Sequence, residues 1–317
     1  MKAAVRSKYG SPKVLSIKEL EPPIPKDNEV LIRVHAATVN RTDCHNLSGM
    51  PFIMRFFIGF FKPRLAITGT DFAGQIEATG KNVKFFKSGD KVMGFEFLGL
   101  QSHADYLTLP DTKEIAIIPE GIKYDQAVAS VEGGYYALSV INKMKPRAGQ
   151  NALVNGATGA IGSAMVQFFK FHGVNITAVC GSENNELVKS LGADRIIDYK
   201  TEDFTKDSER YDFVFDAVGK STFGKCKSLL KKNGIYSSSG APNLWRIFIT
   251  SLSGGKKEIF APPKNLKASL DFIKALVEKG SFRPVIDRTY SIDKIAEAYE
   301  YVASGRKIGN VIVTMYP

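Results

Sequence analysis

Two short segments of the sequence carry the residue types that most directly suggest chemistry. In the first, NRTDCHNLSG (residues 40–49), Asp43, Cys44 and His45 are consecutive, and all three residue types bind metals. Cys44 and His45 are adjacent at the expected start of a helix, so their side chains point in different directions. We therefore predict that Cys44 is a small buried hydrophobic residue and that Asp43 caps the turn.

The second segment, VNGATGAIGSAM (154–165), places three glycines between an expected strand and an expected helix. Gly156 permits a tight turn, Gly159 lets the backbone approach a pyrophosphate, and Gly162 lets the helix pack on the strand. The helix N-terminus adds free N–H groups and partial positive charge. The segment predicts a dinucleotide site formed by Gly156, Ala157, Thr158, Gly159, Ala160, Ile161 and Gly162, and the alternative is a tight turn without a ligand.

The end of the next strand bears on the choice between NAD and NADP. An NAD site places Asp or Glu about 20 residues after the glycine turn, where the carboxylate binds the ribose hydroxyls. Here the strand is expected to end at Cys180–Gly181, and Ser182 follows. Ser182 and Asn185 can donate hydrogen bonds to a 2′-phosphate, although no Arg or Lys follows before Lys189. We predict that the cofactor is NADPH.

The elements that must position these residues follow from hydrophobic periodicity. Residues 1–121 are rich in short strands, of which 29–39 alternates apolar and polar positions. From about residue 123 apolar strands alternate with amphipathic helices, which indicates a parallel sheet covered on both faces. We predict an α/β protein in which a β-rich domain (1–122, completed by 263–317) accompanies a doubly wound domain (123–262).

Composition limits the classes of partner and compartment. The chain has 317 residues, and its net charge of +11 is spread in small clusters, which indicates a solvated basic surface and no nucleic-acid partner. No apolar segment reaches the roughly 18–20 residues that span a bilayer, and no signal peptide is expected. Three scattered cysteines suit a reducing compartment. We predict a cytoplasmic protein.

The order of motifs along the whole chain resembles the medium-chain dehydrogenase/reductase superfamily, in its zinc-free quinone oxidoreductase-like branch. The matching segments are MKAAV, EVLIRVHAATVNRTD, ITGTDFAGQIEATGKNV, GDKVMGF, VNGATGAIGSAMVQFFK, ELVKSLGADRIIDY, FDAVG and PVIDRTYSIDKIAEAYEYVASG. The resemblance implies a GroES-like catalytic domain built from both termini, a Rossmann-like NADP-binding domain between them, and a cleft where cofactor and substrate meet. It also implies a homodimer, and KKEIFAP (256–262) looks like the edge strand that would pair.

The resemblance also bears on metal binding. In zinc-dependent relatives three ligands fall at positions that here are Asn40, Thr70 and the segment ASVEGGYYA, which lacks Cys and His but contains Glu132. Those relatives carry in addition a four-cysteine zinc lobe, which three scattered cysteines cannot build. We predict an enzyme that works without zinc.

The same resemblance implies roles for individual residues. Asn40 would face the nicotinamide, and His45 would contact the substrate oxygen or supply a proton, unless it is a partly exposed helix residue. His103 is a candidate for the rim of the cleft, whereas His35 and His172 look like surface residues. The cofactor would further contact Tyr199, Val218, Gly219, Ser239, Gly240 and either Arg306 or Lys307.

A metal-free site favours one class of reaction. When hydride adds to a quinone or an α,β-unsaturated carbonyl compound, the negative charge moves to an oxygen that hydrogen-bond donors can hold. We predict an NADPH-dependent reductase of a hydrophobic quinone or enone. The alternatives are an alcohol dehydrogenase or aldehyde reductase, and a nucleotide-binding or RNA-binding protein without turnover.

One segment, PFIMRFFIGFFKPR (51–64), is unusually aromatic. Eight of the ten residues 52–61 are apolar, and five of them are Phe. We predict an apolar wall or lid over the substrate site. The alternatives are a helix packed on the domain's own core, and a segment that rests on an anionic bilayer surface with the help of Arg55, Lys62 and Arg64.

Overall fold

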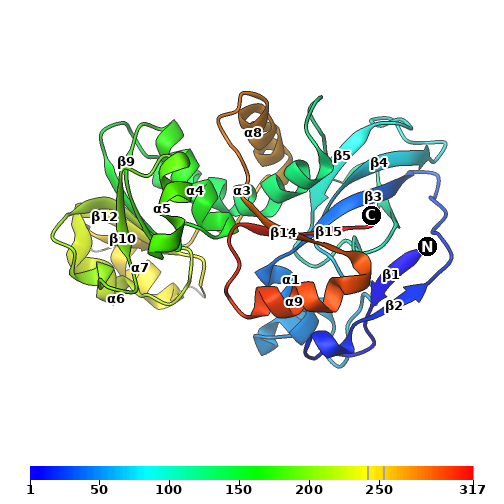
Figure 1. Cartoon of the computed structure of the whole chain (residues 1–317), viewed down its shortest axis with the longest axis horizontal. Helices are drawn as coiled ribbons and strands as arrows, with labels where there is room; N and C mark the ends of the chain where they lie inside the picture. Colours follow the sequence, from blue (N-terminus) through cyan, green and yellow to red (C-terminus); the bar gives the residue numbers. More distant parts are fainter. Residues whose placement is uncertain (114, 241–242, 253, 317) are drawn as a thin grey trace. The chain divides into compact units, whose positions relative to one another are not determined.

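The structure is a computed structural model that describes residues 1–113, 115–240, 243–252 and 254–316. The chain separates into two compact units, whose elements are labelled in Figure 1. The first unit comprises Met1–Glu132, Leu266–Glu278 and Ile286–Pro317, and the second comprises Gly133–Asn265 and Lys279–Val285. The division lies beyond the boundary expected at residue 122, because helix α3 (Tyr124–Met144) is continuous and supplies residues to both units.

The second unit is built on a parallel sheet. Among the described residues the strand order is β10-β9-β8-β11-β12-β13, and every neighbouring pair is parallel. The order reverses between β8 and β11, which is the position where doubly wound sheets bind ligands. The strands are β8 (Asn151–Asn155), β9 (Asn175–Cys180), β10 (Arg195–Asp198), β11 (Tyr211–Asp216), β12 (Leu230–Ser238) and β13 (Lys257–Ile259). This topology confirms the predicted doubly wound sheet.

Helices connect these strands: α4 (Ala160–Phe171), α5 (Asn185–Ser190), α6 (Phe223–Cys226) and α7 (Leu244–Leu252). The sequence pattern of residues 221–232 predicts one continuous helix, and here the structure differs. The helix ends early and β12 begins at Leu230, because Leu229 and Leu230 are both buried in the core of this unit while Lys231 and Lys232 remain exposed.

The first unit joins strands from both ends of the chain. The order β14-β15-β3-β4-β5-β7, with β6 on β3, applies to the described residues. The C-terminal strand β15 pairs antiparallel with β3, and alternate β3 residues Val30, Ile32 and Val34 are fully buried. The strands are β1 (Lys2–Val5), β2 (Ser16–Glu19), β3 (Glu29–Val39), β4 (Asp71–Thr79), β5 (Lys91–Phe95), β6 (Tyr106–Pro110), β7 (Ile115–Ile117), β14 (Ile286–Ser291) and β15 (Asn310–Thr314). The predicted β-rich fold is confirmed.

Two helices distant in sequence lie side by side in this unit. In Figure 1 α9 (Ile295–Ala303, orange) runs beside α1 (Arg41–Ser48, blue), and Arg41 Nη1 donates a hydrogen bond to the Ala303 carbonyl at 3.5 Å. The other helices are α2 (Arg55–Ile58) and α8 (Leu266–Glu278).

Short 3₁₀ helices in both units span Pro12–Val14, Phe52–Met54, Ser182–Asn184, Phe204–Lys206, Lys227–Leu229 and Ile292–Lys294. In the part of the chain that the structure describes, no helix has the length and apolar character needed to cross a bilayer.

Candidate active site

The turn between β8 and α4 has the geometry that a phosphate cradle requires. Gly156 has φ of 76°, and a Cβ there would lie 2.6 Å from Val218 Cγ2. A Cβ on Gly162 would lie 2.0 Å from the Gly156 carbonyl oxygen, so the close helix–turn contact demands glycine. Beside Gly159 an added Cβ would meet only the Gly156 oxygen, at 3.6 Å. The space beside Gly159 is therefore open at the N-terminus of α4, where free backbone N–H groups favour an anion.

Turns that follow β11 and β12 continue this edge of the sheet. The buried Asp216 carboxylate accepts hydrogen bonds from the N–H groups of Val218 at 3.0 Å and Gly219 at 3.1 Å. Ser239 Oγ donates to the Ala217 carbonyl at 2.9 Å. A Cβ on Gly219 would lie 3.1 Å from Gly240 Cα, so the two turns touch. The structure thus brings the predicted residues of both turns together. Asp216, which was not among the predicted residues, holds the turn after β11 through its two hydrogen bonds.

The predicted residues at the end of β9 and β10 are Ser182, Asn185 and Tyr199. The Ser182 N–H donates to Asp198 Oδ2 at 3.3 Å, and Tyr199 is exposed. Lys200 Nζ lies 2.8 and 2.9 Å from the two Glu183 carboxylate oxygens. Lys200 is a cation that no sequence motif singled out, because it comes from the turn that follows β10. Its only sequence signal is its place directly after the predicted Tyr199.

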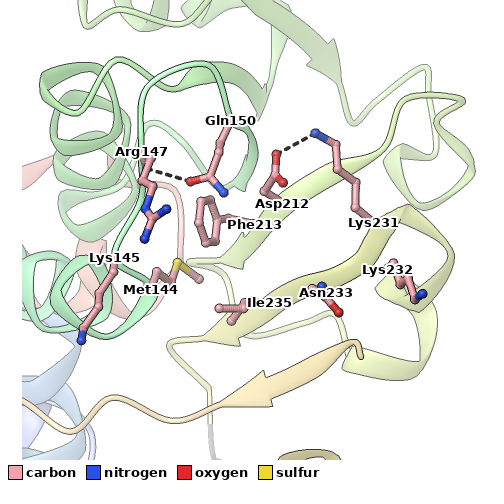
Figure 2. A pocket seen from close by; sticks show the side chains of 10 residues that line it. All are labelled: Met144, Lys145, Arg147, Gln150, Asp212, Phe213, Lys231, Lys232, Asn233 and Ile235. Atoms are coloured by element: carbon pink, nitrogen blue, oxygen red, sulfur yellow. Dashed lines mark hydrogen bonds and ion pairs between the residues drawn. The ribbon is translucent and has the colours of Figure 1, made fainter. Parts of the chain in front are cut away.

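A pocket of about 550 Å³ also opens on the second unit (Figure 2). It lies where β11 and β12 begin, and Asp212 Oδ2 pairs with Lys231 Nζ at 2.8 Å. Because ligands of doubly wound sheets bind at the carboxyl ends of the strands, this pocket is not a candidate for the cofactor site. It is lined by Met144, Lys145, Arg147, Gln150, Asp212, Phe213, Lys231, Lys232, Asn233 and Ile235.

In the first unit, Asn40 joins β3 to α1 within a buried polar network. Its N–H donates to Asp43 Oδ2 at 2.9 Å, which confirms that Asp43 caps the helix. Asn40 Nδ2 donates to the Thr38 hydroxyl, and Thr38 in turn donates its N–H and hydroxyl to Asp71 at 2.7 and 2.6 Å. Thr70 Oγ1 donates to Asp43 Oδ1 at 3.1 Å. The position of Asn40 is thus fixed by hydrogen bonds on both its backbone and its side chain.

Glu132 and Lys307 complete this network. The Thr42 hydroxyl donates to Glu132 Oε1, whereas Glu132 Oε2 is buried and has no hydrogen-bond partner among the described residues. Lys307 Nζ donates to Asn40 Oδ1 at 3.3 Å and to the Gly309 carbonyl at 2.6 Å. Of the two residues proposed as alternatives for the cofactor contact, Lys307 lies at Asn40 and Arg306 is exposed.

The buried carboxyl groups of this network hold protons more tightly than they would in water. Burial raises the pKa of Glu132 to about 7, against the opposing effect of the Thr42 hydroxyl and the Lys307 ammonium. Burial also raises the pKa of Asp43 to about 7 and that of Asp71 well above its usual value. The pKa of Lys307 is lowered by its own burial, and the Glu132 charge opposes that shift. The network can store or release a proton near neutral pH.

His45 and Cys44 lie on α1 outside this network. The His45 side chain is largely exposed. The part of its ring that is covered lowers the pKa of His45, and the positive charge of Arg41 lowers that pKa further. Its role in contacting substrate stays a prediction. Cys44 packs against the core but is only partly buried, which corrects the prediction of a buried residue. Burial still raises the pKa of its thiol to about 12, which makes the thiol unreactive.

The candidate role of His103 at the rim of the cleft is wrong. Its ring is fully buried, with Nε2 2.9 Å from the Thr38 carbonyl oxygen and Nδ1 2.9 Å from Thr68 Oγ1. Burial lowers its pKa to about 4, so the ring is neutral and supports the strand that leads to Asn40. His35 is also less free than predicted, because its ring stacks on Tyr124 at 4.2 Å between centroids.

Comparisons with known proteins agree with this geometry. The family model of the alcohol dehydrogenase GroES-like domain matches residues 26–140, and that of the zinc-binding dehydrogenase matches residues 191–313. The mouse mitochondrial NAD(P)H oxidoreductase RTN4IP1 is 31% identical over 356 residues, covering 99% of this chain and 89% of that protein. The chloroplast envelope quinone oxidoreductase homolog of Arabidopsis thaliana is 30% identical, covering 92% of this chain and 91% of that protein. The chain belongs to the medium-chain dehydrogenase/reductase superfamily, in its zinc-free quinone oxidoreductase-like branch.

The fold agrees with membership of this superfamily. The solved structure of the quinone oxidoreductase from Coxiella burnetii matches with a TM-score of 0.84 at 25% identity, and 99% of each chain is covered. The superfamily and the similarity over nearly the whole chain identify the protein as an oxidoreductase.

The donor set distinguishes this member from the zinc-dependent members of the superfamily. The resemblance sets Asn40, Thr70 and a segment that contains Glu132 against the zinc ligands, and these residues carry an amide, a hydroxyl and a carboxyl group. Each of them is hydrogen-bonded within the protein, to Thr38, Asp43 and Thr42 respectively. Within the described ranges, no group of three or more His, Cys, Asp or Glu residues is arranged to hold a metal ion.

Proposed function

We propose that the protein reduces quinones or α,β-unsaturated carbonyl compounds with NADPH and without zinc. The observation that carries the proposal is the network around Asn40, which offers hydrogen-bond donors and exchangeable protons where zinc-dependent relatives carry metal ligands. The names of two similar proteins, the Arabidopsis and Coxiella quinone oxidoreductases, support the substrate class.

The nicotinamide would supply the hydride, and the chain must supply everything else. The open turn at Gly159 binds the cofactor phosphates. Hydride addition at carbon leaves negative charge on the substrate oxygen, and the Lys307 ammonium can hold that charge or give it a proton. Glu132, with a pKa of about 7, can then return a proton to Lys307. Asn40 holds Lys307 in place through the 3.3 Å hydrogen bond from Nζ.

Two features at the end of β9 support NADPH over NADH. Ser182 occupies the position where a carboxylate would bind the ribose hydroxyls, and Lys200 adds a cation beside it. Lys200 also neutralises Glu183, at 2.8 Å, and so reduces the repulsion that a 2′-phosphate would meet.

The homodimer also belongs to the proposal. Among the residues that the structure describes, β13 lies at the edge of the parallel sheet, so its outer side can meet a second copy. Next to it, the helix α7 exposes apolar side chains, and the Glu258 N–H of β13 bonds Thr250 Oγ1 of α7 at 3.1 Å. A monomer mass by light scattering at micromolar concentration would contradict this assembly. The cytoplasmic location and the absence of a nucleic-acid partner stay predictions.

The test is oxidation of NADPH by the purified protein with a panel of quinones, enones and aldehydes. We expect turnover with quinones or enones, and no loss of turnover after treatment with a metal chelator. Turnover with aldehydes alone would favour the aldehyde reductase alternative. Binding of NADPH without turnover on any member of the panel would favour a nucleotide-binding protein instead.

A further inference from the structure

The aromatic segment near the start of the first unit presents its apolar side chains to solvent. We call the side chains of Met50, Phe52, Ile53, Phe56, Phe57, Phe60 and Phe61 the Phe-rich face. Their exposed fractions range from 43% at Phe60 to 90% at Phe61. The alternative that this segment packs on the domain's own core is therefore wrong.

The segment is amphipathic, but its apolar side faces solvent and its other side faces the protein. Residues 52, 53, 56 and 57 lie on the 3₁₀ and α-helical turns of this segment, and Phe60 and Phe61 follow Gly59, which ends the helix. The other side faces the protein: Ile58 is buried, and Arg55 Nε donates to the Gly49 carbonyl at 3.2 Å. The Arg55 guanidinium also lies 4.6 Å from the centre of the Tyr9 ring. A folded segment whose apolar side points outward indicates a partner for that side.

The rings of the Phe-rich face already contact one another. Phe60 lies 5.6 Å from Phe52, 5.3 Å from Phe56 and 4.9 Å from Phe61, measured between ring centroids. These distances are those of ordinary aromatic pairs. The face is thus a preformed surface whose shape does not depend on the arrival of its partner.

Charge around the face selects the kind of partner. No acidic residue occurs between Asp43 and Asp71, whereas Arg55, Lys62 and Arg64 lie in that interval. Lys62 and Arg64 are both exposed. An apolar surface bordered by cations complements an anionic bilayer, to which each nearby Lys or Arg adds about 1 kcal/mol of attraction. A wall around a neutral substrate would need the rings but not the cations.

We propose that the Phe-rich face docks the protein on an anionic lipid bilayer, with the phenylalanine rings in the acyl boundary and Lys62 and Arg64 at the headgroups. Residues 52–58 form only about two turns of 3₁₀ and α helix, so the contact is interfacial and does not cross the bilayer. The proposal does not rest on the assigned reaction, because it is measured as binding.

The experiment is flotation of the full-length protein with vesicles of phosphatidylcholine alone or with about 30% phosphatidylglycerol. We expect flotation with the anionic vesicles and little with the neutral ones, and we expect 0.5 M salt, roughly three times physiological ionic strength, to weaken it. The variants F57S/F61S and K62E/R64E should each bind about tenfold more weakly. The double variant I24S/F85S removes two other exposed apolar side chains of the same unit and should bind like the original protein.

Melting temperature and NADPH affinity show whether each variant is folded. The proposal is overturned if the original protein does not float with anionic vesicles, or if it floats equally with neutral ones. It is also overturned if I24S/F85S loses binding as F57S/F61S does. Absence of flotation together with a raised Michaelis constant for a bulky quinone in F57S/F61S would assign the face to the substrate wall instead.

Discussion

Replacing Gly159 with Ala tests the proposed phosphate cradle more directly than any other change. Gly159 has φ of −71° and ψ of 169°, a conformation that alanine adopts without strain. The added Cβ would make one ordinary contact, 3.6 Å from the Gly156 oxygen. Loss of unfolded-state entropy stabilises such a variant by about 0.4–1 kcal/mol, and the weaker N-cap preference of Ala opposes this. We expect the free energy of unfolding to change by less than about 1 kcal/mol.

Cofactor binding should respond very differently. The new methyl group would occupy the space through which a pyrophosphate approaches the N–H groups of α4. A hydrogen bond to a charged group contributes about 1.5–3 kcal/mol, so loss of one such bond weakens NADPH binding by roughly 10- to 100-fold. The measurement is a calorimetric titration of NADPH, accompanied by a thermal melt.

Two other glycines of the second unit provide the comparison. Gly162→Ala places Cβ 2.0 Å from the Gly156 oxygen and should lower the melting temperature clearly, because backbone must move. Gly224→Ala lies in α6, and its Cβ would be 3.9 Å from Thr222 Oγ1, so it should change neither quantity. Unchanged NADPH affinity in Gly159→Ala would refute the cradle. So would a loss of affinity accompanied by the same drop in melting temperature as in Gly162→Ala.

Three further changes probe the rest of the site. Ser182→Asp should shift cofactor preference toward NADH in paired titrations, because a carboxylate repels the 2′-phosphate, and tighter binding of NADH by the original protein would contradict the NADPH assignment. Lys307→Met should lower kcat by about 10²-fold while leaving the Kd for NADPH unchanged, and undiminished single-turnover reduction would remove Lys307 from the mechanism. Glu132 has its folded-state pKa raised to about 7 from an ordinary value of 4.5. The folded protein therefore binds more protons than the unfolded chain between those values, and stability falls as pH rises through that window. Glu132→Gln keeps an acceptor for Thr42 and should flatten this fall in thermal melts at pH 5 and pH 8; an equally steep fall in the variant would exclude Glu132 as its cause.

The features predictable from sequence are those that depend on neighbours along the chain. The alternation in residues 29–39 gave β3 with its observed bounds, since a strand with one buried face must repeat with period two. The glycine turn was equally local, because Gly156 and Gly162 meet each other within seven residues. The capping role of Asp43 is also local, because Asp43 lies three residues after Asn40 and its carboxylate accepts a hydrogen bond from the Asn40 N–H.

The features that could not be predicted depend on contacts between distant segments. Lys307 reaches Asn40 across 267 positions of sequence, and Lys200 reaches Glu183 from the turn after β10. The rim position suggested for His103 was wrong because the sequence of a loop-like segment does not show that the ring will be buried. In the structure one carbonyl oxygen and one hydroxyl group are its hydrogen-bond partners. The exposure of the Phe-rich face to solvent could not be predicted either, because an apolar pattern does not say whether the apolar side chains point toward the core or away from it.

The pairing of β15 with β3 has a consequence for how the protein is made. Most of the second unit is a single stretch, 133–265, so its sheet can form while the ribosome is still adding the remainder of the chain. The first unit must wait, because its sheet includes β14 and β15 from the last residues synthesised. Lys307 arrives only with that final segment. A nascent or C-terminally truncated chain would therefore form the glycine turn between β8 and α4 before the network around Asn40. We expect such a chain to bind NADPH without transferring its hydride.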